Sequence, residues 1–439
     1  MKKLPIILLA ILMVFSLFSC AEPENTPPRY AITYSGIERD PESTTAGEKY
    51  KLPADLPKPE EGYKLVVKMG NVVLEAGKEY EITADTVLNC SFEKLKFTLT
   101  IDGKAQAVEY GDTYTILKKK DGKIMKSVKV DDTEFPGDSI VIKKNTTIDY
   151  VWAYTVTYEG LDAVPTAVTS ELQKDVICGT KFTVPYIKGY LIDSIMNGSV
   201  PVKPGSTIEP TSNITLTYTV EKGSPSLLYT DPDENGNVSV KKYADMDNRY
   251  VGDIVIPDMN SDGKLVTGIG RSAFYWCDSI KSVHIPCSVV EIVSNPFLSC
   301  RKISEITVNK NNEKFKSQNS CILSKDGKEL RVYPGFGELP ENITKIGETA
   351  CNGMSSPEIV KIPTTAKEIG YAAFGLCTAA KSIAIPNGVE KIGGYAFNNW
   401  NNTQTINIEK DTDMSKWDSQ WRDECNANVV KDYTPPTTP

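Results

Sequence analysis

A repeat of 23 residues in the second half of the chain constrains the fold more than any other feature. Successive units start at spacings of 23, 54, 23 and 23 residues, and their apolar positions stay in phase. The unit starts are Val266, Val289, Ile343, Ala366 and Val389. A unit this short can bury its apolar side chains only by stacking on its neighbours. The repeat therefore predicts a solenoid with one strand and one turn-and-helix segment in each unit.

Three further positions recur within the units. An isoleucine follows the start by three residues, a glycine by four in four of the five units, and a phenylalanine or cysteine by eight. In that order the residues are Ile269, Ile292, Ile346, Ile369 and Ile392, then Gly270, Val293, Gly347, Gly370 and Gly393, then Phe274, Phe297, Cys351, Phe374 and Phe397. Stacking places equivalent side chains in ladders, so these positions predict a continuous apolar core.

Each unit ends in a short strand in which apolar and polar residues alternate. Apolar pairs such as Val283/Ile285 and Ile383/Ile385 are expected to face the core. Because successive side chains of a strand point to opposite sides, the residues beside these pairs are expected to share one exposed sheet face. They are Ser282, His284, Glu305, Thr307, Ile359, Lys361, Ser382, Ala384, Thr405 and Asn407. This face is the candidate binding surface, since stacked repeats offer extended surfaces to ligands, and a merely solvated sheet is the alternative.

The phrases Ile-Gly-x-x-Ala-Phe-x-x-Cys and Ile-Pro resemble the BspA-like leucine-rich repeat family of bacterial surface proteins. The resemblance covers Asp253 to Ile408, and the spacing of 54 equals one unit of 23 plus an insert of 31 residues. Residues 312–336 resemble the hairpin that often interrupts this family, with Asp326-Gly327 as its turn. The resemblance implies a cell-surface protein that binds host or neighbouring-cell macromolecules, and it supplies no catalytic residues.

Three related units precede the repeats. Each opens with a strand that ends in a turn glycine and closes with an alternating strand behind a polar residue. The openings are Tyr30–Gly36, Phe97–Gly103 and Tyr154–Gly160, and the closing strands follow Asp85, Asn145 and Asn213. These units loosely resemble the Listeria–Bacteroides type repeat, without its Trp after the Gly-Tyr segment, which implies small β-grasp-like sheets. We expect tandem mostly-β modules that act as a stalk.

The N-terminus predicts export and a lipid anchor. Lys2 and Lys3 precede an apolar run, Ile6 to Phe18, that is too short to span a hydrocarbon core of about 30 Å. The segment that ends at Cys20 resembles a bacterial lipobox, which implies cleavage before Cys20 and lipidation of its thiol. An ordinary secretory signal with a chance cysteine is the alternative. We expect attachment to the outer membrane, with exposure at the cell surface.

These patterns predict a domain organisation. The expected parts are a signal peptide at 1–20, a tether at 21–29, β modules at 30–95, 96–153 and 154–221, a linker at 222–240, the repeat domain at 241–430 with a hairpin insert near 310–340, and a disordered tail at 431–439.

Composition argues against several functional classes. The net charge is −8 and no basic cluster of the kind that nucleic-acid binding requires is present, so we expect no nucleic-acid partner. His284 is the only histidine, and no C-x-x-C pair occurs among the cysteines. We therefore expect no enzyme, no cofactor and no metal site. An enzyme with paired carboxylates in a cleft between modules is the remaining catalytic alternative.

Two groups of residues imitate metal sites. Cys277, Cys300 and Cys377 share one repeat position with Met354 and Trp400, which favours buried core residues over metal ligands. Residues 231–236 and 258–263 look like the opening of a calcium loop, but their twelfth positions are Lys242 and Ile269 instead of glutamate. Both segments are therefore predicted to be Asp/Asn-Gly turns.

The function predicted from these patterns is adhesion to, or recognition of, a protein or glycan on host or neighbouring cells. A glycan-capturing lipoprotein that serves an uptake system is the alternative. A row of exposed aromatic side chains would favour the alternative, because sugars stack on aromatic rings. Tyr275, Tyr371, Tyr395 and Trp400 in the turns are the candidates for such a row.

Overall fold

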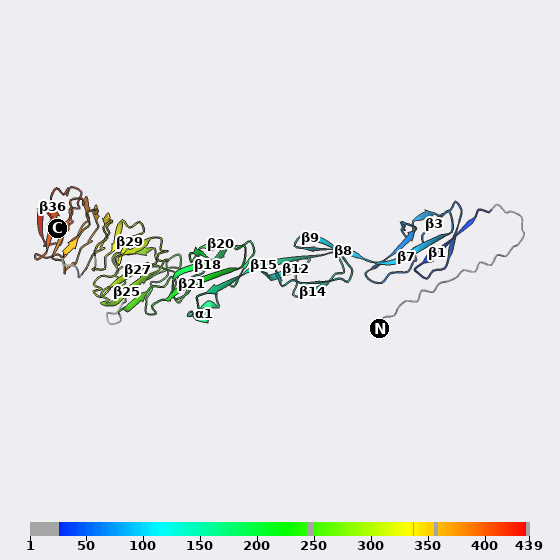
Figure 1. Cartoon of the computed structure of the whole chain (residues 1–439), viewed down its shortest axis with the longest axis horizontal. Helices are drawn as coiled ribbons and strands as arrows, with labels where there is room; N and C mark the ends of the chain where they lie inside the picture. The colour runs from blue at the N-terminus through cyan, green and yellow to red at the C-terminus, as the bar shows by residue number, and fades with distance from the viewer. Residues whose placement is uncertain (1–25, 244–248, 337, 355–358, 436–439) are drawn as a thin grey trace. The chain divides into compact units, whose positions relative to one another are not determined.

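The computed structural model describes residues 26–243, 249–336, 338–354 and 359–435. It divides into two compact units, residues 1–118 with 127–150 and residues 119–126 with 151–439, which we describe separately (Figure 1). The described residues are mostly β-strand, and the one α-helix among them, α1, spans only Thr166–Thr169. No helix in these ranges has the length and apolarity needed to cross a membrane. The predicted signal peptide and Cys20 lie outside the described residues.

The first module has a five-stranded sheet in the order β2-β1-β7-β4-β5. The opening strand β1 runs parallel to the closing strand β7, and β4 runs antiparallel to β7. β3 and β6 pair with each other and form a separate two-stranded sheet. The strands are β1 (Arg29–Ser35), β2 (Glu42–Thr45), β3 (Lys49–Lys51), β4 (Tyr63–Met69), β5 (Val72–Leu74), β6 (Glu79–Glu81) and β7 (Thr86–Lys94).

The second and third modules repeat this arrangement. In the second module β8 pairs with β9 and runs parallel to the first half of β15, while β10 and β14 form the separate pair. In the third, the second half of β15 pairs with β16 and runs parallel to β21, which pairs with β18. The strands are β8 (Lys96–Ile101), β9 (Lys104–Glu109), β10 (Thr113–Thr115), β11 (Lys119–Lys120), β12 (Lys123–Val130), β13 (Thr133–Glu134), β14 (Ser139–Val141), β15 (Thr146–Glu159), β16 (Asp175–Ile177), β17 (Phe182–Thr183), β18 (Tyr190–Asn197), β19 (Val200–Val202), β20 (Thr207–Ile208) and β21 (Ile214–Lys222).

The polar residue before each closing strand has the same structural role in the three modules. Its side-chain oxygen accepts a hydrogen bond from a backbone N–H of the opening strand, which ties the two parallel strands together at one end. The pairs are Ala31 N to Asp85 Oδ1 at 2.8 Å, Thr98 N to Asn145 Oδ1 at 2.9 Å and Thr155 N to Asn213 Oδ1 at 3.0 Å. The recurring residue in the sequence is therefore a recurring hydrogen bond in the structure.

Each 23-residue unit of the second half contributes two short strands and a series of turns. Each unit begins with a start strand and finishes with an end strand, in which apolar and polar residues alternate. The start strands and the insert are β22 (Val238–Val240), β24 (Val266–Ile269), β26 (Glu291–Ile292), β28 (Phe315–Gln318), β29 (Cys321–Ser324), β30 (Glu329–Val332), β31 (Lys345–Ile346), β33 (Glu368–Ile369) and β35 (Lys391–Ile392). The end strands are β23 (Val251–Val255), β25 (Ser279–Ile285), β27 (Glu305–Val308), β32 (Ile359–Lys361), β34 (Ser382–Ile385) and β36 (Thr405–Glu409), followed by β37 (Asn428–Tyr433).

The turns replace the helix that the repeat pattern predicted. Several non-glycine residues between the two strands of a unit have positive φ, including Ser272 at 55°, Trp276 at 58°, Ala372 at 45° and Leu376 at 56°. A left-handed residue interrupts an α-helix, so these segments turn repeatedly instead of coiling. The expectation of a turn-and-helix segment was wrong for the described residues of the repeats.

The core of the repeats is a ladder of equivalent side chains. Phe274 and Phe297 stack at a centroid distance of 5.1 Å and an interplanar angle of 10°, and Phe374 and Phe397 stack at 5.7 Å and 4°. All four rings are buried. Stacked aromatic pairs of this kind add about 1 kcal/mol each beyond the area that they bury.

Candidate functional site

The predicted outward residues lie on the end strands, and hydrogen-bonded pairing brings them into register. Ser282 pairs with Glu305 and His284 with Thr307, while farther along the repeats Ser382 pairs with Thr405 and Ala384 with Asn407. The apolar neighbours on the same strands, such as Ile383 and Ile406, are fully buried. Nine of the ten predicted residues are accessible to solvent, and the side chain of Ile359 lies outside the described set.

The insert divides this row between two sheets. One contains β23, β25 and β27, and the other contains β32, β34, β36 and β37. Between them the chain forms the antiparallel strands β28, β29 and β30. β30 pairs in parallel with β31 and so joins β31, β33 and β35 in one sheet, which we call the start-strand sheet, while β22, β24 and β26 form a separate one. The predicted single face is thus divided into a first end-strand face on β23, β25 and β27 and a second end-strand face on β32, β34, β36 and β37.

Residues of the first face already have partners within the second compact unit. The Ser282 hydroxyl donates to Asp253 Oδ1 at 2.7 Å. His284 Nδ1 lies 2.9 Å from Oε2 of Glu221, which belongs to β21 of the third module. The predicted solvent-facing histidine is therefore partly covered by the module that precedes the repeats.

A buried carboxylate joins the third module to the repeats. Asp258 has no exposed surface, and its Oδ2 accepts the backbone N–H of Ile192 in β18 at 2.8 Å. Its Oδ1 accepts the backbone N–H of Ser288 at 3.0 Å and the thiol of Cys287 at 3.2 Å. Burial raises the pKa of Asp258 above its ordinary value, although these hydrogen bonds act in the opposite direction. Sequence reasoning missed this role because Asp258 and Ile192 are far apart in the chain.

The second face offers side chains that are not engaged by the protein itself. Lys361 is exposed, and Ser382, Ala384, Thr405 and Asn407 are partly exposed. Among the described residues, the side chains of Ser382, Thr405 and Asn407 make no hydrogen bond within the chain. Their hydroxyl and amide groups are therefore free to bind water or a ligand.

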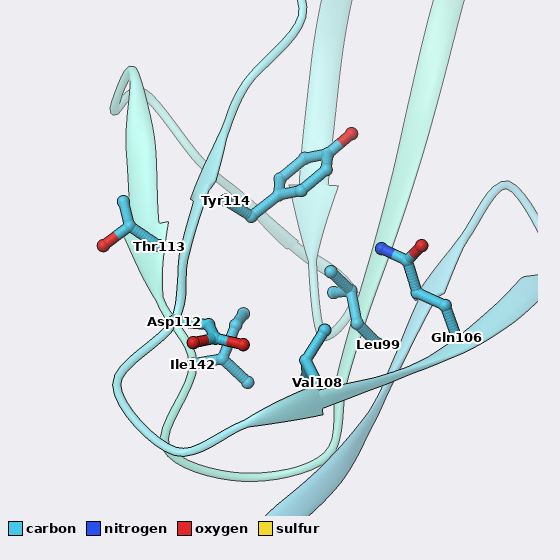
Figure 2. Close-up of a pocket in the computed structure, with 7 residues that line it drawn as sticks. All are labelled: Leu99, Gln106, Val108, Asp112, Thr113, Tyr114 and Ile142. Atoms are coloured by element: carbon cyan, nitrogen blue, oxygen red, sulfur yellow. The ribbon is translucent and has the colours of Figure 1, made fainter.

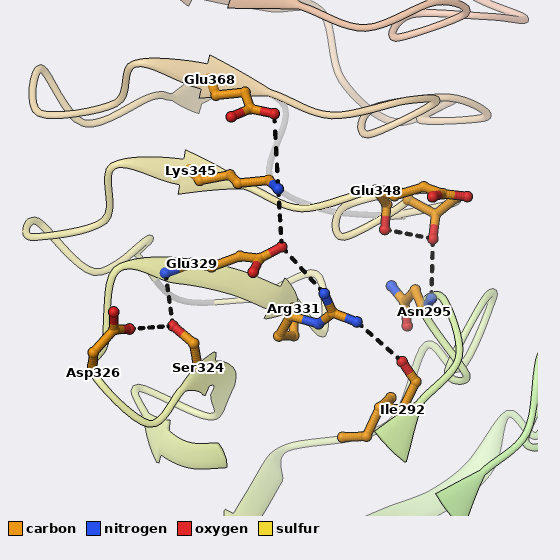
Figure 3. Close-up of polar contacts among 10 residues, drawn as sticks. Ile292, Asn295, Ser324, Asp326, Glu329, Arg331, Lys345, Glu348 and Glu368 are labelled. Carbon is orange, nitrogen blue, oxygen red and sulfur yellow. Dashed lines mark hydrogen bonds and ion pairs between the residues drawn. The ribbon is translucent and has the colours of Figure 1, made fainter. Parts of the chain in front are cut away.

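The start-strand sheet differs because its charged side chains pair with one another (Figure 3). Glu329 lies 3.2 Å from Arg331 and 3.6 Å from Lys345, and Lys345 lies 3.7 Å from Glu368. Arg331 also donates to the carbonyl of Ile292 at 3.3 Å. These groups link successive strands across the stack, which makes this sheet a poorer candidate for ligand binding than the second end-strand face.

The cysteines at the shared repeat position are buried hydrogen-bond donors. Cys300 Sγ donates to the carbonyl of Phe274 at 2.8 Å, and Cys377 Sγ donates to that of Cys351 at 3.1 Å. Trp400 at the same position donates through Nε1 to the carbonyl of Phe374 at 2.7 Å. Each of these three bonds joins one unit to the preceding one. Met354 at the same position has no donor, so what the five residues share is a buried apolar side chain. Burial raises the pKa of the Cys377 thiol to about 12.

Both calcium-like segments use their side-chain oxygens to cap turns. Asp233 Oδ1 accepts the backbone N–H of Asn235 at 2.9 Å and of Asn237 at 2.8 Å. Asn260 Oδ1 accepts those of Asp262 at 3.1 Å and Lys264 at 2.8 Å. No cluster of three or more potential metal ligands occurs within the residues that the structure describes.

The turn aromatics fall into two groups. Trp400 is buried in the core, so it does not belong to a row of exposed rings. Tyr371 is 50% exposed and lies 5.7 Å from the ring of Tyr395, and Tyr275 stacks on Trp276 at the same distance.

A family model described as the BspA type leucine-rich repeat region matches residues 248–323 and 337–425 in six copies. These stretches of the chain are therefore BspA-type leucine-rich repeats, which confirms the resemblance seen in the phrases Ile-Gly-x-x-Ala-Phe-x-x-Cys and Ile-Pro. No curated protein sequence matches the chain.

Several solved structures are similar to part of the chain. Leucine-rich repeat proteins from Eubacterium ventriosum and Bacteroides ovatus match 41% and 42% of this chain, with 19% and 24% identity and TM-scores of 0.26 and 0.23. The matches cover 55% and 41% of those two proteins, so the chain spans about half of their length. A leucine rich cell surface protein from Faecalibacterium prausnitzii matches 48% of this chain and is covered to 94%, with 15% identity and a TM-score of 0.24.

Proposed function

We propose that this chain is a lipid-anchored bacterial surface protein, without catalytic activity, whose repeats bind a protein or glycan on host or neighbouring cells. Cys20 would carry the lipid in the outer membrane, and the three β modules would form a stalk. The repeats would form a solenoid, and its second end-strand face, on β32, β34 and β36, would contact the ligand.

One observation carries the proposal. The second end-strand face presents polar groups that make no hydrogen bonds within the described chain, whereas the charged groups of the start-strand sheet pair with one another. Ser382, Thr405 and Asn407 are small or uncharged. A neutral polar surface of this kind suits a protein or glycan better than an anionic polymer, which requires cationic side chains.

We expect the double substitution Ser382→Arg and Asn407→Arg to weaken binding to cells about tenfold or more, because two bulky cations would stand in the centre of the face. Binding of fluorescently labelled protein to cultured epithelial cells, measured by flow cytometry, tests this. The matched control is Thr364→Arg, which places an arginine at an exposed turn residue outside both sheets. Unchanged binding by the double variant would contradict the proposal and would show that another part of the chain binds the cells.

The proposed location has its own test. Protease treatment of intact bacteria, followed with an antibody to the repeats, should remove the protein rapidly if it is displayed outside. Protection until the outer membrane is opened would place the protein in the periplasm and would contradict a role in adhesion.

The second candidate function, glycan capture for an uptake system, is favoured by the exposed Tyr371 beside Tyr395. Exposed rings offer apolar faces to the C–H groups of sugars. Tyr371→Ala should then reduce binding to a polysaccharide and leave binding to cell-surface proteins unchanged.

A further inference from the structure

The second β module contains an open pocket of about 280 Å³ (Figure 2). Leu99, Val108 and Ile142 form its apolar part, and Tyr114, Gln106 and Asp112 supply an aromatic ring, an amide and a carboxylate. Every lining residue belongs to the first compact unit. The pocket is separate from the repeats and plays no part in the function proposed above.

The pocket exists because one connection of the shared module fold is short. Between the opening strand and its antiparallel partner, the first module has six residues, 36–41, and the third has fifteen, 160–174. The second module has only Asp102 and Gly103, which turn with φ of 46° and 79°. Such a two-residue hairpin turn leaves no chain to cover the end of the core.

In the first module the longer connection fills the corresponding place. The strand pairing makes Ile32 and Glu42 the counterparts of Leu99 and Gln106. Tyr50, in β3, is the counterpart of Tyr114 in β10. Glu42 accepts the Tyr50 hydroxyl at 2.7 Å and the Arg39 Nε at 2.8 Å, so a residue of the connection occupies the site.

In the third module the connection contributes to the core instead. Leu161 and Val164 of this connection are buried in one apolar cluster with Phe182, the counterpart of Tyr114. Val168 in α1 packs against the same cluster. Two of the three modules thus close the site with their own chain, and the second leaves it open.

The open site retains polar groups that can bind a ligand. Asp112 Oδ2 accepts the backbone N–H of Glu109 at 2.9 Å, which fixes the carboxylate and leaves Oδ1 available. The Gln106 side chain makes no hydrogen bond with other described residues. Figure 2 shows Leu99 and Val108 between Gln106 and Asp112, with the Tyr114 ring beside them.

We propose that this pocket binds a single neutral sugar ring of hexose size, either free or within a longer glycan. A sugar has an apolar C–H face, which fits Tyr114 and the aliphatic side chains, and hydroxyl groups that can donate to Asp112 and bond with Gln106. The volume is slightly below the range of about 300–1,000 Å³ for drug-sized ligands, which limits the occupant to one ring. The lining holds a carboxylate and no cationic side chain, so an anionic ligand is disfavoured.

Titration of the full chain with four methyl glycosides, those of glucose, galactose, mannose and N-acetylglucosamine, tests this inference. Methyl resonances of Leu99, Val108 and Ile142, observed by NMR in protein labelled at Ile, Leu and Val, should shift and saturate with at least one glycoside. We expect a dissociation constant of about 1 mM, because a small open site makes few contacts.

Gln106→Ala should abolish saturation, since it removes one of the two polar partners from an exposed position. Lys104→Ala, on the same strand but outside the lining, should leave the titration unchanged. Failure of all four glycosides to shift these methyl groups, or an unchanged titration with Gln106→Ala, would overturn the inference. The double arginine variant of the repeat face should titrate normally, so this inference and the proposed function can fail independently.

Discussion

Replacement of Asp258 by alanine is expected to lower the free energy of unfolding of the second compact unit by about 3 kcal/mol. The substitution leaves the backbone N–H groups of Ile192 and Ser288 without their acceptor at a site that water does not reach. Each unsatisfied buried donor costs about 1–3 kcal/mol. Urea denaturation followed by tryptophan fluorescence is the measurement, since four of the five tryptophans lie after residue 270.

The control for Asp258→Ala is Asp262→Ala in the same segment, because the Asp262 side chain is exposed. We expect Asp262→Ala to change the free energy of unfolding by less than about 0.5 kcal/mol. Equal effects of the two substitutions would show that the buried carboxylate does not stabilise the junction between the third module and the repeats.

The stability deficit of Asp258→Ala should also depend on pH. Burial raises the pKa of Asp258 in the folded chain. When the pKa of a carboxyl group is higher in the folded than in the unfolded chain, its protonation stabilises the folded state. This contribution is fully present below the pKa of the unfolded chain, about 4, and is lost as the pH rises through the pKa of the folded chain. We therefore expect a larger deficit at about pH 4 than at about pH 7, and an equal deficit would contradict the effect of burial.

The stacking register of the repeats could be predicted from the sequence because it depends on a pattern that each unit repeats. The predicted neighbours Ser382 and Thr405 pair directly, and Phe374 lies on Phe397. The start strand of each unit could not be predicted in this way. A strand such as Glu291–Ile292 is too short to show an alternating pattern, and it is defined only by its pairing with the preceding unit.

The sequence patterns could not predict the partners of the candidate site, for a different reason. The contacts of Glu221 with His284 and of Asp258 with Ile192 join residues of unlike modules, so no repeat places them together. The pocket of the second module follows from the length of one connection. The sequence contains this short connection as Asp102-Gly103. Its effect on the pocket becomes evident only when the structures of the three modules are compared.

Replacement of Gly370 by alanine is expected to destabilise the repeats by about 3 kcal/mol, because the added methyl group overpacks the contact between neighbouring units. A Cβ atom at Gly370 would lie 2.7 Å from the backbone nitrogen of Glu348, and one at Gly393 would lie 2.7 Å from that of Tyr371. Backbone cannot move aside as a flexible side chain can, so the stack must shift. This contact explains the recurrence of glycine at the position.

Gly394→Ala is the matched control for Gly370→Ala and should have the opposite sign. A Cβ atom at Gly394 would meet no atom closer than 3.7 Å, so the methyl group fits without a clash. Alanine also restricts the unfolded chain, which should stabilise this variant by about 0.4–1 kcal/mol. The free energy of unfolding from urea denaturation distinguishes the two. Equal stability of the two variants would mean that the units are not held together by close backbone contact, and the recurring glycine would need another explanation.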